Sequence, residues 1–213
     1  MQSNFSIMGM IQEGYYATYP LLFISVICLA IIFERAWALY GVGPKTAKLA
    51  DALVPQLRQG KFNEALQATQ ARGTAAQRIY HTLIAGSQTL DRDHLLELDD
   101  ERRYQEGLEF KRYIWVLATA GASAPFIGLF GTVVGILVAF QSMAIMGTGG
   151  FSVVAAGISA ALISTALGLG VAIVAVIFFN YFSVKVENIN AMQHINDDRL
   201  IDAALQGRQK HGN

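Results

Sequence analysis

The sequence predicts an all-α integral membrane protein with three transmembrane helices and long cytoplasmic helical extensions. Residues 113–184 contain no Asp, Glu, Lys, Arg or His, although the whole chain has 16 basic and 16 acidic residues. A charge at the centre of a spanning helix costs about 2.5–3.5 kcal/mol, so a long uncharged stretch is typical of membrane burial. The composition agrees, with 53% hydrophobic and 15% charged residues and a mean hydropathy of +0.37. No strand-like alternation of apolar and polar residues competes with the helical interpretation.

Three segments are long enough to cross a bilayer, which needs about 20 mostly apolar residues per helix. The first is bounded by Glu13 on one side and by Glu34 and Arg35 on the other. The uncharged stretch has room for two more, and the glycine-rich cluster at 147–150 is the natural turn between them. We therefore expect the following segments: spans at 14–33, 113–145 and 152–184, and a turn at 146–151.

The placement of basic residues predicts the orientation of these spans. Residues 1–34 have no Lys or Arg, whereas 35–112 has twelve and 185–213 has four. By the positive-inside tendency, the N-terminal residues 1–13 and the turn face the periplasm, and 34–112 and 185–213 face the cytoplasm. No cleaved signal peptide is expected, because the start of the chain has no basic residue. The lone Cys28 has no partner for an intrachain disulfide.

The segment 34–112 is predicted to form short helices and then a charged one. Pro44 is expected to open the first helix, and the expected interruptions are Pro55, Gly60, Gly73 and Gly86. From Asp91 onward a charged helix is expected, with Asp99 and Arg103 at the i,i+4 spacing of a surface ion pair. Only Gly107 interrupts it before the second span, so one long helix is expected to enter the membrane. The third span is likewise expected to continue past Lys185 toward Gly207.

Small residues recur at helical spacing in the second and third spans. Because lipid tails are as apolar as Leu, membrane helices associate through close packing, which small residues permit. The expected helix-packing residues are Gly128, Gly131, Gly135, Gly157 and Gly168. Pro125, inside the second span, is expected to kink or locally unwind that helix.

Both spans also carry uncharged polar side chains, including Thr119, Thr132, Ser159, Ser164 and Thr165. Two interpretations are open: such hydroxyls can bond back to the backbone one turn earlier, or they can line a narrow hydrated path. No catalytic motif is present, since no Lys follows the glycines at 128–131 to make a phosphate-binding loop. His81 and His94 lack neighbours at metal-ligand spacing, so we expect neither an enzyme nor a metal, cofactor or nucleic-acid site.

The stretches 124–136 (APFIGLFGTVVGI) and 156–169 (AGISAALISTALGL) resemble the MotA/TolQ/ExbB proton-channel family, particularly its three-span TolQ and ExbB branch. The resemblance implies a stator subunit of an ion-driven motor in the bacterial inner membrane. Such subunits form a homo-oligomeric ring, pentameric in the family, around a single-span partner dimer resembling ExbD, TolR or MotB. Each partner helix supplies an Asp, and protons or sodium ions then drive work on a periplasmic or outer-membrane machine.

By correspondence of motif, Thr132 and Thr165 occupy the hydroxyl positions that line the family's ion path, and Ser159 is expected to help complete it. The sequence departs from the branch at Ala160, where the pattern Gly-Ile-Ala-Glu-Ala-Leu has Glu, and at Ala156 and Val174, where the branch usually has Pro. Any proton-binding carboxylate at membrane depth must then come from the partner. The alternative is a passive oligomeric scaffold that presents its cytoplasmic helices to a protein partner.

Overall fold

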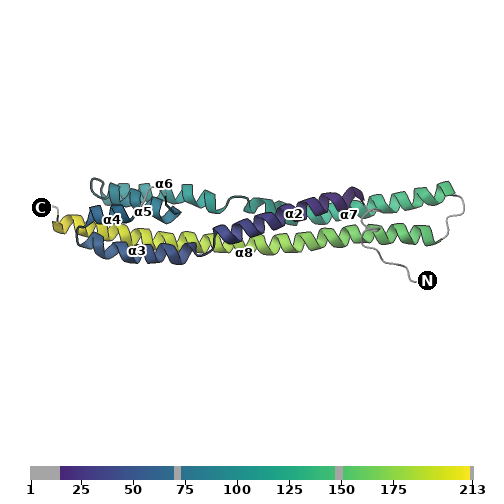
Figure 1. Cartoon of the computed structure of the whole chain (residues 1–213). Helices are drawn as coiled ribbons and strands as arrows, with labels where there is room; N and C mark the ends of the chain where they lie inside the picture. The colour runs from purple at the N-terminus through teal and green to yellow at the C-terminus, as the bar shows by residue number, and fades with distance from the viewer. Residues whose placement is uncertain (1–14, 70–72, 147–150, 212–213) are drawn as a thin grey trace. The chain divides into compact units, whose positions relative to one another are not determined.

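The computed structural model describes residues 15–69, 73–146 and 151–211, and all seven elements of regular structure in these residues are α-helices (Figure 1). The chain divides into two compact units. We call residues 1–36 and 113–182 the membrane unit, and residues 37–112 and 183–213 the extension unit. The predicted N-terminal segment 1–13 and the glycines 147–150 lie outside the described residues.

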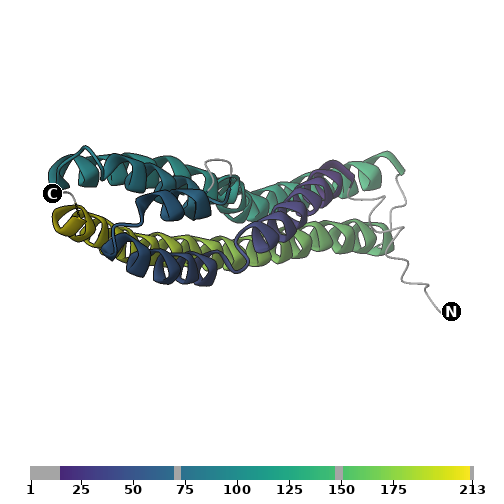
Figure 2. The ribbon, with the colours of Figure 1, turned by 60° about the vertical axis from the view of Figure 1, so that its left-hand side comes forward.

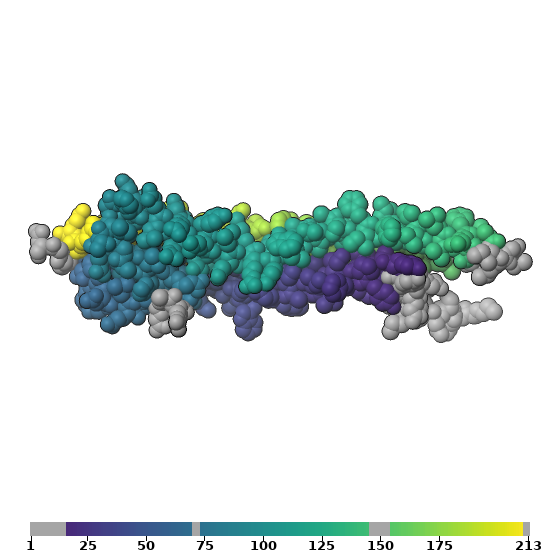
Figure 3. Space-filling model, turned by 90° about the horizontal axis from the view of Figure 1, so that it is seen from above, coloured from purple at the N-terminus to yellow at the C-terminus, as the bar shows by residue number. Residues whose placement is uncertain are grey.

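Three helices build the membrane unit: α2 (Tyr15–Ala38), α7 (Ile114–Met146) and the first part of α8 (Phe151–His211). They lie side by side in two views (Figures 1 and 2), and a third view shows α2 along α7 (Figure 3). Three helices among the described residues are long and apolar enough to cross a membrane. Only 28%, 22% and 22% of their most apolar stretches is buried within the chain, so most of this surface faces lipid or other chains.

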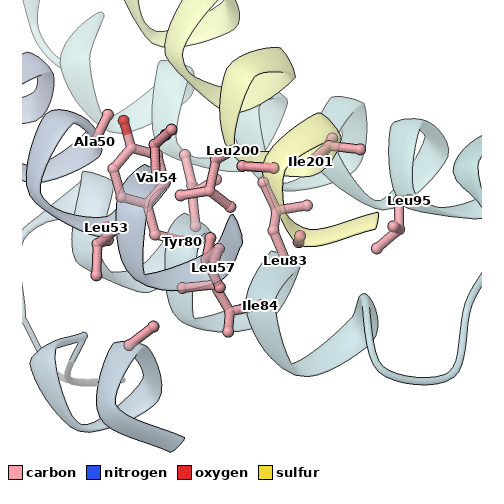
Figure 4. Packing of buried hydrophobic residues seen from close by; sticks show 14 of the residues in the cluster. Ala50, Leu53, Val54, Leu57, Tyr80, Leu83, Ile84, Leu95, Leu200 and Ile201 are labelled. Carbon is pink, nitrogen blue, oxygen red and sulfur yellow. The ribbon is translucent and has the colours of Figure 1, made fainter. Parts of the chain in front are cut away.

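The extension unit packs four helices around the C-terminal part of α8: α3 (Val42–Arg58), α4 (Phe62–Ala68), α5 (Ala75–Gly86) and α6 (Arg92–Phe110). Its core contains aliphatic side chains and one large aromatic residue, Tyr80, all drawn from several helices (Figure 4). Leu57, Leu83 and Leu200 contribute from α3, α5 and α8 and are fully buried. An interior of this kind, stabilised by removal of apolar surface from water, is that of a soluble helical domain.

Local sequence signals explain most helix ends in the extension unit. Gly41 and Gly60 have φ of 69° and 74°, a left-handed conformation that glycine adopts without steric cost. Thr74 forms a capping box with Gln77 at the start of α5, and the Asp91 carboxylate accepts the His94 amide at the start of α6. The predicted break at Gly60 and the predicted helix end at Gly86 are confirmed.

The predicted interruption at Pro55 is wrong, because α3 continues through it to Arg58. A proline inside a helix removes the amide that would bond the carbonyl four residues earlier, here that of Asp51. Asp51 and Pro55 both lie on the exposed side of α3. Water can therefore bond that carbonyl, and the helix tolerates the proline.

The prediction of one continuous helix into the second span is also wrong. Helix α6 ends at Phe110, a turn follows, and α7 begins at Ile114. Tyr113 has a φ of 63°, which is costly for a residue with a side chain and ends the helical path. The Arg112 amide bonds the Glu109 carbonyl at 3.2 Å, a tightened last turn. No Gly or Pro marks this break, so helix-breaker arguments could not find it.

Two other helical predictions are confirmed. Helix α8 runs without interruption from Phe151 to His211, well past Lys185. Asp99 and Arg103 form an ion pair on α6, with Arg103 Nε 2.8 Å from Asp99 Oδ2. Asp99 is nevertheless 1% exposed, so this is a buried pair and not the surface pair that the spacing suggests.

The contact between α3 and α8 at Gly207 should be intolerant of any side chain. A Cβ at Gly207 would lie 1.9 Å from the Leu57 carbonyl oxygen, so Gly207→Ala must push the two helices apart. We expect a loss of about 1–3 kcal/mol, the usual cost of overpacking, measured as lower thermal stability of the full chain in detergent.

Gly107→Ala in α6 is the matched control for Gly207→Ala. Its Cβ would make only ordinary contact, at 3.8 Å from Asn190, and alanine favours a helix by up to about 1 kcal/mol over glycine. Equal stability of the two variants would contradict the close approach at Gly207.

Candidate functional site

The candidate site lies where the backbones of α7 and the membrane part of α8 come into close contact. A Cβ at Gly168 would lie 2.5 Å from the Ala124 carbonyl oxygen and 3.1 Å from Gly128 Cα. A Cβ at Gly128 would in turn lie 2.8 Å from the Ser164 carbonyl oxygen. The two backbones therefore meet with no room for side chains, which is the packing mode available to helices in lipid.

Small residues continue this contact along both helices. A Cβ at Gly135 would lie 2.9 Å from Ala161 Cβ, and one at Gly157 would lie 2.5 Å from Ala139 Cβ. At Gly131, α7 also contacts α2, because a Cβ there would lie 2.5 Å from Ala17 Cβ. The structure thus places all five expected packing glycines against a neighbouring helix within this chain.

Thr165 provides a polar link across this interface. Its hydroxyl Oγ1 donates to the Gly128 carbonyl oxygen of α7 at 3.0 Å, and the side chain is only partly buried. The link exists because Gly128 has no side chain to keep α8 away from its carbonyl group. A hydroxyl that uses its proton in this way still has oxygen lone pairs with which it can accept a hydrogen bond.

Thr132 and Ser159 are placed differently. The Thr132 hydroxyl donates to the Leu129 carbonyl oxygen of its own helix at 2.6 Å, and the residue is 9% exposed. Such back-bonding is one of the two interpretations of these hydroxyls that the sequence left open. Ser159 of α8 is partly buried. The three expected pathway residues thus lie on two facing helices, and the Thr165 hydroxyl bonds across the interface whereas that of Thr132 bonds within its own helix.

One polar contact of the membrane unit was missed by sequence reasoning. Thr18 of α2 is 1% exposed, and its Oγ1 lies 3.4 Å from the Ser164 Oγ of α8, which is equally buried. Ser164 was noted as a polar residue, but Thr18 was not singled out. The available signal was Ala17 and Thr18 together, two small residues among the large side chains of the first span.

Pro125 lies within α7, which continues from Ile114 to Met146 without interruption. The local unwinding that was one expectation for Pro125 is therefore absent, and a kink remains a prediction. Proline lacks the amide that would bond the Gly121 carbonyl. That carbonyl belongs to a stretch where α8 is close, since a Cβ at Gly121 would lie 2.6 Å from Val176 Cγ2.

The chemistry available where α7 meets the membrane part of α8 is that of neutral oxygen atoms. Residues 113–184 contain no carboxylate, and Ala160, which stands where the family branch has Glu, is 5% exposed. The described residues contain no group of three or more His, Cys, Asp or Glu side chains that could hold a metal ion. Hydroxyl and carbonyl oxygens can coordinate a cation or pass a proton, but they do not retain a proton near neutral pH.

Fold and site together define a multi-pass membrane protein whose second and third spans form a closely packed, hydroxyl-bearing hairpin. The sequence profile of the MotA/TolQ/ExbB proton channel family matches residues 67–194, more than half of the chain. The chain belongs to this family, whose members are non-enzymatic transport proteins.

Individual relatives support this assignment. The chain is 30% identical to the biopolymer transport protein ExbB of Salmonella typhimurium over 204 residues, which cover 90% of this chain and 83% of that protein. It is 31% identical to ExbB of Pseudomonas putida over 175 residues, 78% of this chain and about half (52%) of that protein. It is 43% identical to the Tol-Pal system protein TolQ of Pseudomonas aeruginosa over 88 residues, 41% of this chain and 36% of that protein.

Gly168 offers a direct test of the close approach between α7 and α8. Gly168→Ala places a methyl group against the backbone of α7, so we expect a loss of about 1–3 kcal/mol. The measurement is the thermal stability of the purified full chain in detergent.

The control is Gly170→Ala, two residues along the same helix, where a Cβ would meet nothing within 4 Å. It should leave stability unchanged or slightly raised. Gly170 lines an apolar groove of about 450 Å³ between α2 and α8, beside Cys28 and Leu29. A destabilising Gly170→Ala would indicate that a helix of another chain occupies this groove.

Proposed function

We propose that this chain is the ion-conducting stator subunit of a bacterial inner-membrane motor. It would form a homo-oligomeric ring, pentameric as in the family, around an ExbD/TolR/MotB-like single-span dimer. The complex would couple the proton or sodium motive force to work on a periplasmic or outer-membrane machine. The observation that carries the proposal is a family match that includes both helices of the hydroxyl-bearing hairpin.

The partner's Asp would supply a group that α7 and the membrane part of α8 lack. A proton needs a titratable group on its way, and α7 and the membrane part of α8 provide only hydroxyl, amide and carbonyl groups. An Asp carried on a partner helix, next to Thr132 and Thr165, would supply that group. The threonine oxygens would then transfer the proton to or from this Asp, or replace part of the hydration shell of a sodium ion.

The exposed surface of α7 supports assembly with other chains. Phe126, Phe130 and Leu137 are 69%, 59% and 64% exposed, so this face is covered only by lipid or by a further helix. In the proposed ring, part of such surface would contact neighbouring copies. We place the N-terminus in the periplasm and the extension unit in the cytoplasm, because 15 of the 16 basic residues lie in the latter.

A passive oligomeric scaffold is the second candidate, and two hydrogen bonds favour it. Thr165 donates to Gly128 and Thr132 donates to Leu129, so both hydroxyl protons are used inside the chain. In this alternative the hydroxyls only complete helix packing. The membrane unit would then serve to oligomerise, and the extension unit would present its helices to a protein partner.

Substitution of the threonines separates the two functions. We expect Thr132→Ala and Thr165→Ala each to abolish proton flux, or sodium flux, through the purified complex in proteoliposomes while the complex stays assembled. The reason is that alanine keeps the small volume needed for packing but removes the oxygen that faces the ion. Flux is followed with a dye for internal pH or sodium, and assembly by native mass spectrometry.

Thr119→Ala is the matched control, because Thr119 lies on the same helix, is exposed and bonds back to the Trp115 carbonyl oxygen at 3.1 Å. It should retain full flux. Wild-type flux in both pathway variants would favour the scaffold, as would a purified assembly with no single-span partner and no ion conduction.

A further inference from the structure

Two aspartates are buried together in the extension unit, outside the predicted spans. Asp99 of α6 is 1% exposed and Asp197 of α8 is 0% exposed. Their carboxyl groups are close enough to share a hydrogen bond, and each alters the proton affinity of the other. Two ionised carboxylates cannot remain in contact away from water, because burial penalises each charge and the charges repel.

Arg103, the cation that contacts this site, does not neutralise both carboxylates. Arg103 Nε lies 2.8 Å from Asp99 Oδ2 and 3.9 Å from Asp197 Oδ2, but its N–H is directed at neither oxygen. The Arg103 guanidinium also bonds Asp100, an exposed carboxylate at the rim. Two carboxylates beside one guanidinium therefore leave one negative charge inside the unit.

A third buried polar group faces the same point. Gln193 is 3% exposed, its amide lies close enough to Asp197 to influence that carboxyl, and neither its Oε1 nor its Nε2 has a directed hydrogen bond among the described residues. Buried amides are normally paired, and an unpaired one costs about 1–3 kcal/mol. A protonated carboxyl provides a donor that the ionised pair lacks, and the Gln193 carbonyl and the Asp99 carboxylate are both acceptors.

We propose that Asp99 and Asp197 together hold one proton, forming a proton-binding site that joins α6 to α8 in the extension unit. The proton bridges the two carboxyl groups and lowers the charge of the buried pair to −1, which Arg103 balances. When the site empties, the proton passes to buffer in the solvent and the pair takes up a second negative charge. The two helices then repel each other at this point and α6 opens more often.

The groups around the pair define its pH dependence. Besides Arg103 and Asp100, the pair is faced by Tyr80 of α5, and the surroundings of Tyr80 include Asp51 of α3 and Arg199 of α8. Burial, and then the Asp99 charge, raise the pKa of Asp197 to about 9, and burial also raises the pKa of Asp99. Burial and the two aspartates raise the pKa of Tyr80, so Tyr80 stays neutral.

The sign of the linkage follows from these directions. An unfolded Asp releases its proton near its ordinary pKa of 3.8, whereas the folded pair retains a proton up to about pH 9. Between these two values the folded state binds more protons than the unfolded state, so its stability falls as the pH rises. The loss is complete above the folded pKa, and below the unfolded pKa the contribution is fully present.

Infrared spectroscopy of the full chain in detergent tests the proposal directly. A protonated carboxyl has a carbonyl band distinct from that of a carboxylate, and the wild type should lose one such band as the pH is raised from neutral to alkaline. Asp197→Asn should lack the band at neutral pH. In Asp99→Asn the titration should move to lower pH, because the neighbouring negative charge is gone.

Asp198→Asn is the matched control, since Asp198 is adjacent to Asp197 and its side chain is 43% exposed. It should titrate as the wild type does. Amide hydrogen exchange of α6, corrected for the intrinsic effect of pH, should rise across the same transition in the wild type and in Asp198→Asn. It should stay flat in Asp197→Asn, which imitates the protonated pair.

Several outcomes would overturn the proposal. An unchanged titration in Asp197→Asn would assign the proton to another group, and failure of that variant to fold would show that the charged form is the one required. The wild type is also titrated with choline as the sole buffer cation. A band that appears only when sodium and potassium are removed would mean that the pair binds a metal cation instead.

Discussion

The close approach of α7 and α8 at Gly128 and Gly168 is the contact on which the membrane unit depends. A single methyl group at either position would collide with the opposite backbone. The same absence of side chains lets Thr165 reach the Gly128 carbonyl, so packing and polar chemistry have one cause. In lipid, where helices gain little from hiding apolar surface, this contact does what a hydrophobic core does in water.

The two units consequently differ in the kinds of side chain that they bury. The extension unit buries large aliphatic residues and Tyr80, and tolerates two carboxyl groups in its interior. The membrane unit buries many small residues and hydroxyls, and most of its large apolar side chains are exposed, although Leu21, Leu117 and Phe182 are buried. Helix α8 belongs to both, and its sequence changes character between Phe182 and Lys185, where the uncharged stretch ends.

The sequence could predict features that depend on one helix alone or on whether that helix is surrounded by lipid or by water. The uncharged stretch, the small-residue spacing and the continuity of α8 are of this kind. It could not predict the break at Tyr113, which no glycine or proline marks, or the contact of Thr18 with Ser164, which needs the position of α2. The pair Asp99–Arg103 was found by its spacing, but its neighbour Asp197 lies almost a hundred residues away in the sequence and could not be foreseen.

The distribution of carboxyl groups also constrains how protons interact with this chain. A buried carboxyl retains a proton at neutral pH only if a second charge or strong desolvation raises its pKa, and Asp197 meets both conditions. Within 113–184 no residue can do so, since hydroxyls and carbonyl groups relay protons without storing them. In the two proposals, a proton is therefore held and relayed by different residues. Within the proposed motor, a proton bound at the depth of α7 would be held by a carboxylate of the partner.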